Sequence, residues 1–500
     1  MKKRMRRAVS LMLLCLLLTP CMAISADAAF RDVPAGHPAS TSIRRCVELG
    51  FFKGEQPDRF GLGHPMTRAG FAVVLGRFFG WEPVKGLDSP FQDVPASSWY
   101  AGAVQAAYHH GAFTRQSDTF RPADPVTREE LAVVLVRALG YGTIAGLVQD
   151  LPMPFRDVDT NGGYITMAWE LGLMEGTSAT AFSPERPATR EELATILMRL
   201  YDKLHAPAVG KVGVAAGAED LPDLSGFQAV AVAEGKLLYQ EGSVRMTAES
   251  DPAETAALRQ AVKAAGAAEL LYAPGTANIL RGSVDETARM LAETVSDGGY
   301  AGVLLDVPGV TYEQRKSLTT LVSALDRALK GKLVYVTAEA PVRQKDGGYD
   351  YTALAEKADR LVVRVAPGSG RSGGIPTAPL EPLEEVYYAM GRLKDQVGAE
   401  KLSLLLTTAN RVWTGGRNGE LLSSRETAAL LEKSQIDGYY SDRYACAYLS
   451  GSLDRQELVV WYLDERSVAE RAELLHCFGV DQICFSQLNG LLPEVLKAAR

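Results

Sequence analysis

Two short motifs that recur three times within the first 205 residues constrain the fold most, because a repeat of fixed period is one structural unit used again. The first motif occurs as Phe30-Arg31-Asp32-Val33, Phe91-Gln92-Asp93-Val94 and Phe155-Arg156-Asp157-Val158. The second occurs as Thr67-Arg68-Ala69-Gly70, Thr127-Arg128-Glu129-Glu130 and Thr189-Arg190-Glu191-Glu192. A helical pattern that ends in Gly lies between the motifs, and an apolar helical pattern follows the second one. Each repeat is therefore predicted to be helix, loop, helix.

The second motif predicts the start of a helix. Thr is a good N-cap, and a Glu three positions later can accept a hydrogen bond from the N–H of the cap. The Arg between them lies in the first turn, where its charge opposes the helix dipole at a cost of roughly 0.3 kcal/mol or more. An Arg at this unfavourable position in all three repeats indicates that it faces something anionic, although a solvated Arg is the alternative.

These motifs, spread over residues 30–203, resemble S-layer homology domains. The resemblance implies a three-pronged helical bundle whose grooves bind the secondary cell-wall polysaccharide of Gram-positive-type bacteria, often at a negatively charged pyruvylated sugar. It implies the polysaccharide-binding residues Asp32, Arg68, Asp93, Trp99, Arg128, Asp157 and Arg190. Arg can make bidentate contacts to a carboxylate and an aromatic face can stack on a sugar, whereas each Asp could instead serve as a turn residue.

The repeats also differ from one another. Repeat 1 has Gly36-His37-Pro38, and repeat 3 has Asn161-Gly162-Gly163, near the place that Trp99 takes in repeat 2. Repeat 1 further ends its second motif in Gly70, so its capping box is incomplete. The best-formed groove is therefore expected to involve repeat 2.

A different pattern begins at Phe227, after a stretch rich in small residues, Gly and Pro that predicts a linker over residues 206–226. Predicted strands alternate with amphipathic helices, as in a parallel sheet built from βαβ units. The strands are predicted at Ala229–Val232, Leu270–Ala273, Gly302–Leu305, Leu333–Val336, Leu361–Val365, Leu402–Leu406, Leu458–Tyr462 and Gln482–Phe485. About eight such units predict a (β/α)8 barrel of the TIM type. A doubly wound open sheet is the alternative, but no Gly-rich phosphate loop supports it.

The segment from Gly299 to Val310 ends a predicted strand in Asp306 and resembles the strand-four signature of glycoside hydrolase family 18, the chitinase-like group. That signature reads Asp-Gly-x-Asp-x-Asp-x-Glu, and its last Glu protonates the leaving oxygen. Aligned on Gly302 and Asp306, its first and second Asp fall at Ala301 and Leu304, and its Glu falls at Pro308. Pro has no proton to donate, and general acid assistance is worth about 10²–10⁴-fold.

Two further positions depart from the family. Its aromatic hydroxyl after strand six falls at Ala366 or Pro367, and the Trp of its sugar pocket falls at Ser486. The barrel is therefore expected to be non-catalytic, a pseudoenzyme that binds glycan or serves a structural role. The alternative is a wall-bound glycoside hydrolase that acts on N-acetylhexosamine glycans, such as peptidoglycan, with a relocated acid.

Residual catalytic candidates follow the predicted strands. Asp306 and Glu339 could form an acid pair if their carboxyl groups lie about 5–9 Å apart. Asp464 is a third carboxylate near the mouth, with an N-cap as its alternative role. Loop aromatics that could form a glycan platform, or simply pack, are Trp413, Tyr439, Tyr440 and Tyr444.

The first residues predict export. Five basic residues, the apolar run Leu11–Leu18 and the small residues Ala26-Asp27-Ala28 form a secretory signal peptide over residues 1–28. The expected location is therefore the cell wall or S-layer, and the protein is not expected to be embedded in the membrane after cleavage.

The composition limits which ligands and partners the protein is expected to bind. A net charge of −7 gives no basic surface for nucleic acid, and six scattered His predict neither a metal site nor a cofactor. Cys46, Cys446, Cys477 and Cys484 have no C-x-x-C spacing and are expected to be buried thiols. The predicted domains are the signal peptide 1–28, three repeats at 29–88, 89–150 and 151–205, the linker 206–226 and the barrel 227–500.

Overall fold

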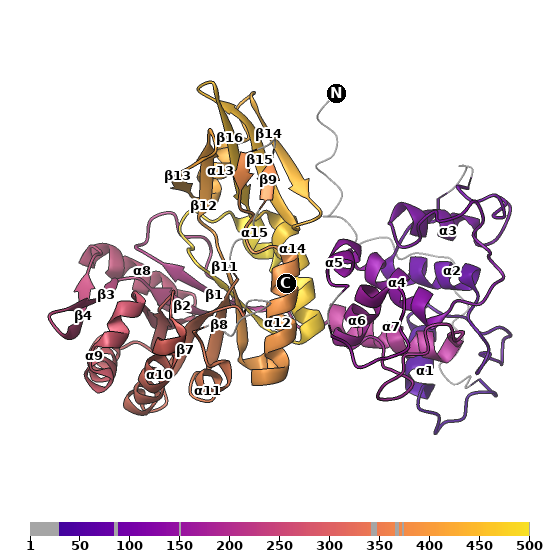
Figure 1. Cartoon of the computed structure of the whole chain (residues 1–500), viewed down its shortest axis with the longest axis horizontal. Coiled ribbons are helices and arrows are strands. Elements are labelled where there is room, and N and C mark those ends of the chain that lie inside the picture. The colour runs from indigo at the N-terminus through magenta and orange to yellow at the C-terminus, as the bar shows by residue number, and fades with distance from the viewer. Residues whose placement is uncertain are drawn as a thin grey trace.

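The computed structural model describes residues 30–84, 89–149, 152–341, 348–365, 370–372 and 375–499. The predicted signal peptide, residues 1–28, and the positions Ala366 and Pro367 lie outside the described residues. Figure 1 shows a helical N-terminal body beside a barrel, with an antiparallel sheet standing on the barrel. Within the described residues, no helix combines the length and the apolar character needed to cross a membrane.

The helical body contains the three predicted repeats. Its helices are α1 (Ser40–Glu48), α2 (Arg68–Phe79), α3 (Ala101–His109), α4 (Arg128–Ala138), α5 (Gly142–Leu147), α6 (Gly162–Glu170) and α7 (Arg190–Leu204). The second helix of each repeat packs against the first helix of the following repeat: α2 with α3, α4 with α6, and α7 with α1. The last pair closes the series, so the repeats form a ring rather than an open stack.

Three backbone hydrogen bonds close this ring at its centre. The N–H of Met66 donates to Ala188, that of Ala188 donates to Val126, and that of Val126 donates to Met66, each at 2.8 Å. Each of these three residues directly precedes the Thr of one copy of the second motif. The complete capping boxes predicted at Thr127 and Thr189 are present, whereas Thr67 accepts only the N–H of Gly70 because Gly has no side chain to return the bond.

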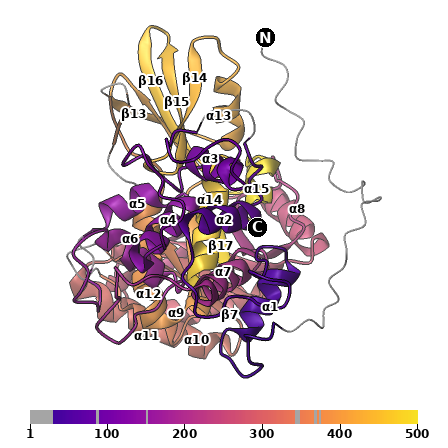
Figure 2. The same ribbon diagram turned by 90° about the vertical axis from the view of Figure 1, so that its right-hand side faces the viewer.

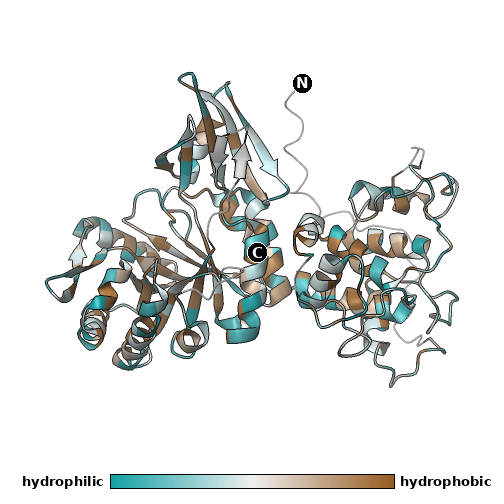
Figure 3. Ribbon diagram, viewed as in Figure 1, coloured by the Kyte–Doolittle hydropathy of each residue, from teal (hydrophilic) through white to brown (hydrophobic). Residues whose placement is uncertain are grey.

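The C-terminal body is a closed parallel barrel, as the sequence predicts, and not an open sheet. In chain order its described strands are β1 (Gly210–Ala215), β2 (Phe227–Val232), β5 (Ala268–Pro274), β6 (Gly302–Asp306), β7 (Leu333–Glu339), β8 (Arg360–Arg364), β11 (Leu402–Leu406) and β17 (Gln482–Phe485). The helices around it are α8 (Pro252–Ala264), α9 (Val284–Asp297), α10 (Arg315–Leu329), α11 (Tyr351–Ala355), α12 (Leu383–Val397), α14 (Glu465–Phe478) and α15 (Pro493–Ala498). Figure 3 shows hydrophobic strands inside and hydrophilic residues on the outer helix surfaces.

Two expectations about this body were wrong. The predicted linker over residues 206–226 contains β1, which pairs with both β17 and β2 and closes the barrel. Its small residues fit a crowded position, since a Cβ on Gly213 would lie 2.5 Å from the Leu488 side chain. The predicted barrel strand at Leu458–Tyr462 is β16 (Gln456–Tyr462) of the antiparallel sheet, because a short apolar run suits either kind of core strand.

That sheet is inserted between the last two barrel strands. Its order is β13 (Arg417–Leu422), β12 (Asn410–Thr414), β16, β15 (Cys446–Leu453) and β14 (Ile436–Ser441), and α13 (Ser424–Leu430) accompanies it. Figure 2 shows it standing above the barrel. Two hairpins are also inserted: β3 (Gly235–Gln240) with β4 (Ser243–Ala248), and β9 (Gly370–Ser372) with β10 (Ile375–Thr377).

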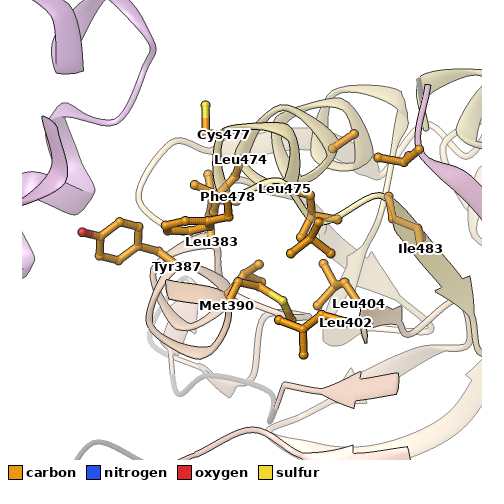
Figure 4. Close-up of a cluster of buried hydrophobic side chains, with 14 of the residues drawn as sticks. Leu383, Tyr387, Met390, Leu402, Leu404, Leu474, Leu475, Cys477, Phe478 and Ile483 are labelled. Carbon is orange, nitrogen blue, oxygen red and sulfur yellow. The ribbon is translucent and has the colours of Figure 1, made fainter. Parts of the chain in front are cut away.

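The two bodies are docked through α12 and α14, which contact α5 and α7 of the helical body. Figure 4 shows the apolar cluster that α12, α14 and the strands β11 and β17 form together, with the Tyr387 ring at its edge on the side of the helical body. The Tyr387 hydroxyl donates to the carboxylate of Glu170, and Lys203 Nζ donates to the carbonyl of Cys477 at 2.6 Å. All four predicted thiols are free and buried, and Cys477 is one of them.

Candidate functional site

The three motif arginines link each repeat to the next. Each Nε donates to the carbonyl of a Phe in the following repeat: Arg68 to Phe120 at 2.6 Å, Arg128 to Phe182 at 2.9 Å and Arg190 to Phe60 at 2.9 Å. Each guanidinium also lies over the ring of the same Phe, at 4.9, 4.7 and 4.9 Å from the centroid. Burial lowers the pKa of all three arginines, although nearby carboxylates oppose this shift. The sequence predicts that these arginines face an anion. In the structure their hydrogen bonds link each repeat to the following one.

A groove lies beside Arg68, and repeat 2 supplies most of its lining. The lining residues are Arg68, Ala112, Phe113, Thr114, Gln116, Glu129, Glu130, Val133, Val134, Arg137 and Asn161. Glu130 lies 2.5 Å from Arg68 Nη1, and Glu129 accepts hydrogen bonds from Thr160 and Asn161. The charged side chains of this groove therefore include two arginines and two glutamates, and both glutamates are engaged within the protein.

The three motif aspartates take the turn role that the sequence also allows. Both carboxylate oxygens of each accept backbone N–H groups from the loop before the second motif: Asp32 from Phe60, Gly61 and Leu62, Asp93 from Phe120 and Arg121, and Asp157 from Phe182 and Ser183. These hydrogen bonds lower the pKa of Asp32, although its burial opposes them, and they also lower the pKa of Asp157. The aspartates position the loop whose Phe carbonyl receives the Arg.

Trp99 is the most exposed large hydrophobic residue among the described ones, at 73% exposure. Its ring contacts only the edge of Tyr100 among the described aromatic pairs, at a centroid distance of 5.4 Å. An open indole face of this kind is available for stacking on a sugar.

Asp306 lies at the C-terminal end of β6 and is held within the barrel mouth. Its oxygens accept hydrogen bonds from Tyr272 Oη at 2.6 Å, Thr337 Oγ1 at 2.7 Å and Arg364 Nη2 at 2.8 and 2.9 Å. The residue is 6% exposed. Burial, and after it the Asp306 carboxylate, raises the pKa of Tyr272, so the phenol keeps the proton that it donates.

Leu304, a second interior position of β6, carries an apolar side chain. Leu304 lies in the apolar cluster that fills the barrel interior, together with Tyr335 and Cys484. Since alternate residues of a strand share a face, Leu304 and Asp306 point inward, and the position of the expected general acid carries Pro308.

Glu339 ends β7 and is exposed. It accepts the N–H of Gly309 at 2.9 Å, and no hydrogen bond joins it to Asp306 in the described part of the chain. Asp464 is the N-cap of α14 and accepts the N–H and hydroxyl of Ser467, which confirms the N-cap alternative. The structure therefore does not bring the predicted carboxylates into one hydrogen-bonded group.

Glu381 is a residue at the mouth that sequence reasoning missed. It is 1% exposed, has a φ of +28°, and accepts the N–H of Thr407 at 3.2 Å through Oε1, while Oε2 has no hydrogen-bond partner within the described residues. Burial raises the pKa of Glu381 to about 7. Nothing in its local sequence distinguishes it from glutamates on the surface, since its burial is produced by the tertiary fold.

The predicted aromatic platform is largely packed. Trp413 is 9% exposed, and Trp461 is buried with its Nε1 donating to Thr377 Oγ1 at 2.7 Å. Tyr448 stacks on Tyr439 at a centroid distance of 5.3 Å and lies tilted by 39° against Trp461, 4.7 Å away. Of this stack, Tyr439 at the sheet edge is the exposed member, at 48%. The guanidinium of Arg466 lies over the ring of Tyr440, and the ring of Tyr444 packs edge-on against Trp461.

Comparison with known families identifies the helical body. The model of the S-layer homology domain matches residues 90–132 and 154–194, which are the second and third repeats. The chain contains S-layer homology domains. The first repeat has the same helix–loop–helix order and closes the ring through α1 and Arg190, so we refer to residues 30–205 as the S-layer homology region. These domains place the protein at the cell surface.

Two relatives illustrate the breadth of proteins that share sequence with this chain. An endoglucanase of Bacillus sp. (strain KSM-635) is 28% identical over 266 residues, which are 48% of this chain and 27% of the endoglucanase. An S-layer protein of Bacillus thuringiensis subsp. finitimus is 29% identical over 192 residues, which are 38% of this chain and 23% of that protein. The chain thus spans about a quarter of the length of these relatives.

The barrel matches a solved chitinase in fold. The crystal structure of the chitinase from Chromobacterium violaceum superposes with a TM-score of 0.51 at 19% sequence identity, over 58% of this chain and 98% of the chitinase. The barrel is therefore like that of family 18 glycoside hydrolases in architecture.

Proposed function

We propose that this protein is held on the cell wall by its S-layer homology region, which binds secondary cell-wall polysaccharide, and that its barrel binds glycan or serves a structural role without cleaving it. The first half of the proposal rests on the matched domains and on the groove lined by Arg68 and repeat 2. The second half rests on the hydrogen bonds that Asp306 accepts at the barrel mouth.

The observation that carries the second half is the set of contacts around Asp306. A carboxyl group that assists glycoside cleavage must face the substrate and move a proton at the reacting oxygen. The carboxylate oxygens of Asp306 instead accept hydrogen bonds from Tyr272, Thr337 and Arg364, and its side chain is buried. Pro308 stands where the general acid is expected, and the apolar Leu304 fills the interior beneath.

Glu339 favours a second candidate function. It is an exposed carboxylate at the C-terminal end of a barrel strand, which is the edge where TIM-barrel enzymes place their catalytic groups. In this alternative the protein is a wall-bound hydrolase of N-acetylhexosamine glycans in which Glu339 acts as a relocated acid.

The test uses the complete protein and two preparations of cell-wall sacculi, one with the polysaccharide attached and one from which it has been extracted. Two quantities are measured in parallel: the protein bound to the sacculi, and the fluorophore released from a fluorogenic N-acetylglucosamine oligomer. The proposal expects binding only to polysaccharide-bearing walls and no release of fluorophore. Release that Glu339→Gln abolishes, and that Glu356→Gln on the outer surface leaves unchanged, would establish the hydrolase instead.

A further inference from the structure

A second cavity lies on the flank of the barrel, outside the mouth that Asp306 and Glu339 occupy. It has a volume of about 510 Å³, is open to solvent, and is bounded by α8 on one side and by the hairpin of β3 and β4 on the other. These elements lie on the side of the barrel that is turned away from the helical body (Figure 1). The volume falls within the range of about 300–1,000 Å³ that is usual for ligand sites in proteins.

One face of α8 forms a wall of this cavity. The residues on it are Pro252, Thr255, Ala256 and Arg259, which share a face because they follow one another at helical spacing. Ala248, at the end of β4, lines the cavity from the hairpin. The apolar part of the lining is therefore made of small side chains, and no aromatic residue of the described chain belongs to it. Such a wall suits small aliphatic groups rather than the face of a sugar ring.

Glu234 supplies a carboxylate to the cavity. Its backbone carbonyl accepts the N–H of Glu249 at 2.8 Å and the hydroxyl of Ser250 at 3.1 Å, which holds the residue at the base of the hairpin. The Tyr300 hydroxyl donates to Oε1, and Oε2 has no hydrogen-bond or ion-pair partner among the described residues. Burial, and after it the hydrogen bond to Glu234, raises the pKa of Tyr300, so the phenol remains the donor.

Arg259 supplies a donor on the other side of the Tyr300 ring. Its Nε donates to the Glu269 carboxylate at 2.7 Å, its Nη2 donates to the Gly298 carbonyl at 2.6 Å, and its guanidinium lies 4.4 Å from the ring centroid. Nη1 makes no hydrogen bond within the described part of the chain. Since Glu269 already balances the charge of Arg259, the carboxylate of Glu234 is the unbalanced charge of the cavity.

These two unused atoms select a class of ligand. The net negative charge is unfavourable for phosphates and other polyanions, and one carboxylate is too few ligands for a metal ion. A primary ammonium group can donate to Oε2 of Glu234, and a carbonyl oxygen close to it can accept from Nη1 of Arg259. An ammonium group followed directly by a carbonyl is the amino end of a peptide, and the small wall residues restrict the side chains that follow.

We propose that this cavity binds the free amino end of a short peptide with small side chains. The ammonium group binds Glu234, the first carbonyl binds Nη1 of Arg259, and the side chains pack along Ala248 and Ala256. The ligand is a peptide and the cavity lies outside the barrel mouth. This inference therefore goes beyond the proposed function and does not depend on it.

Trialanine with free ends is the probe, titrated into the complete protein at millimolar concentrations in a calorimeter. Acetylation of its amino end is expected to weaken binding about 10-fold or more, because it removes the charged hydrogen bond to Glu234. Amidation of its carboxyl end is expected to change binding less than about 2-fold, because that end meets neither charged group.

Glu234→Gln tests the carboxylate itself. The amide oxygen can still accept from Tyr300, so the fold is retained while the charge is lost, and trialanine binding is expected to weaken about 10-fold or more. Glu249→Gln is the matched control, since Glu249 is exposed, pairs with Lys236 and does not line the cavity. This control is expected to change binding less than about 2-fold.

Ala256→Phe tests the cavity without touching a charged group. Ala256 is exposed on α8 and lines the cavity, so a Phe there occupies the space of the peptide and is expected to weaken binding about 10-fold or more. Ala257→Phe, at the next exposed position of the same helix and outside the lining, is expected to leave binding unchanged. The melting temperatures of both variants are expected to match that of the unmodified protein.

The outcomes decide the inference independently of wall binding. A failure of the unmodified protein to bind trialanine overturns it, and so does equal binding of the acetylated peptide. Unchanged binding by folded Glu234→Gln, or by folded Ala256→Phe, also overturns it. None of these results bears on whether the S-layer homology region binds polysaccharide.

Discussion

Replacing Arg128 with Met is expected to destabilise the S-layer homology region by about 4 kcal/mol. The substitution leaves two carbonyl oxygens, of Phe182 and Glu175, without the donors that now lie at 2.9 and 2.5 Å. Each unsatisfied acceptor costs about 1–3 kcal/mol, and the lost contact with the Phe182 ring at 4.7 Å costs about 0.5–2 kcal/mol more. The thioether chain of Met keeps most of the apolar packing, so the polar losses dominate.

Calorimetry of the complete protein measures this loss. About 4 kcal/mol corresponds to a fall of roughly 8–16 °C in the unfolding temperature of a body of this size. Arg44→Met is the matched control, since Arg44 is 66% exposed and its only described ion pair, with Glu48, is 3.8 Å long. The control is expected to cost less than about 0.5 kcal/mol. Equal melting of both variants would show that the arginines do not hold the repeats together.

Three further predictions concern the barrel and the docking of the two bodies. Arg364→Gln is expected to destabilise the barrel by about 3 kcal/mol in urea unfolding, because it leaves the buried Asp306 without its cation, and Asp306→Asn in the same chain should recover part of the loss. Since burial raises the pKa of Glu381 from 4.5 to about 7, the folded state binds this proton more tightly than the unfolded one, and stability falls by about 3 kcal/mol as the pH rises from 4.5 through 7. Glu381→Gln should flatten this slope in melts at pH 4.5 to 7.5, and an unchanged slope would locate the titration elsewhere. Tyr387→Ala should open the interface and speed the reaction of Cys477, now 1% exposed, with a thiol reagent at least 10-fold.

Sequence reasoning predicted the parts of this fold that local pattern determines. The repeated motifs predict the helices and two complete capping boxes, and the alternation of strands and helices predicts the closed barrel. It missed β1 because Gly210–Ala215 contains two glycines, of which Gly213 has no room for a Cβ beside Leu488, and glycines in a strand weaken its hydropathy pattern. It assigned β16 to the barrel because an apolar run carries no information about the sheet that it joins.

The candidate site was harder to predict, because its decisive contacts join distant residues. The sequence singles out the motif arginines by their unfavourable place in the first helical turn. Their partners lie 52, 54 and 130 residues away along the chain, so only the closed ring reveals them. Glu381 gives no sequence signal for the same reason, whereas Asp306 and Pro308 could be judged from the strand signature alone.

The most direct test of the central claim is to incubate the complete protein with polysaccharide-bearing walls and to measure bound protein and released reducing sugar in the same samples over time. The predicted result is saturable binding with no release of sugar above that of walls alone. Release that grows with time and stops in Glu339→Gln would contradict the assignment of a non-hydrolytic barrel, and binding that survives extraction of the polysaccharide would contradict the assignment of the anchor.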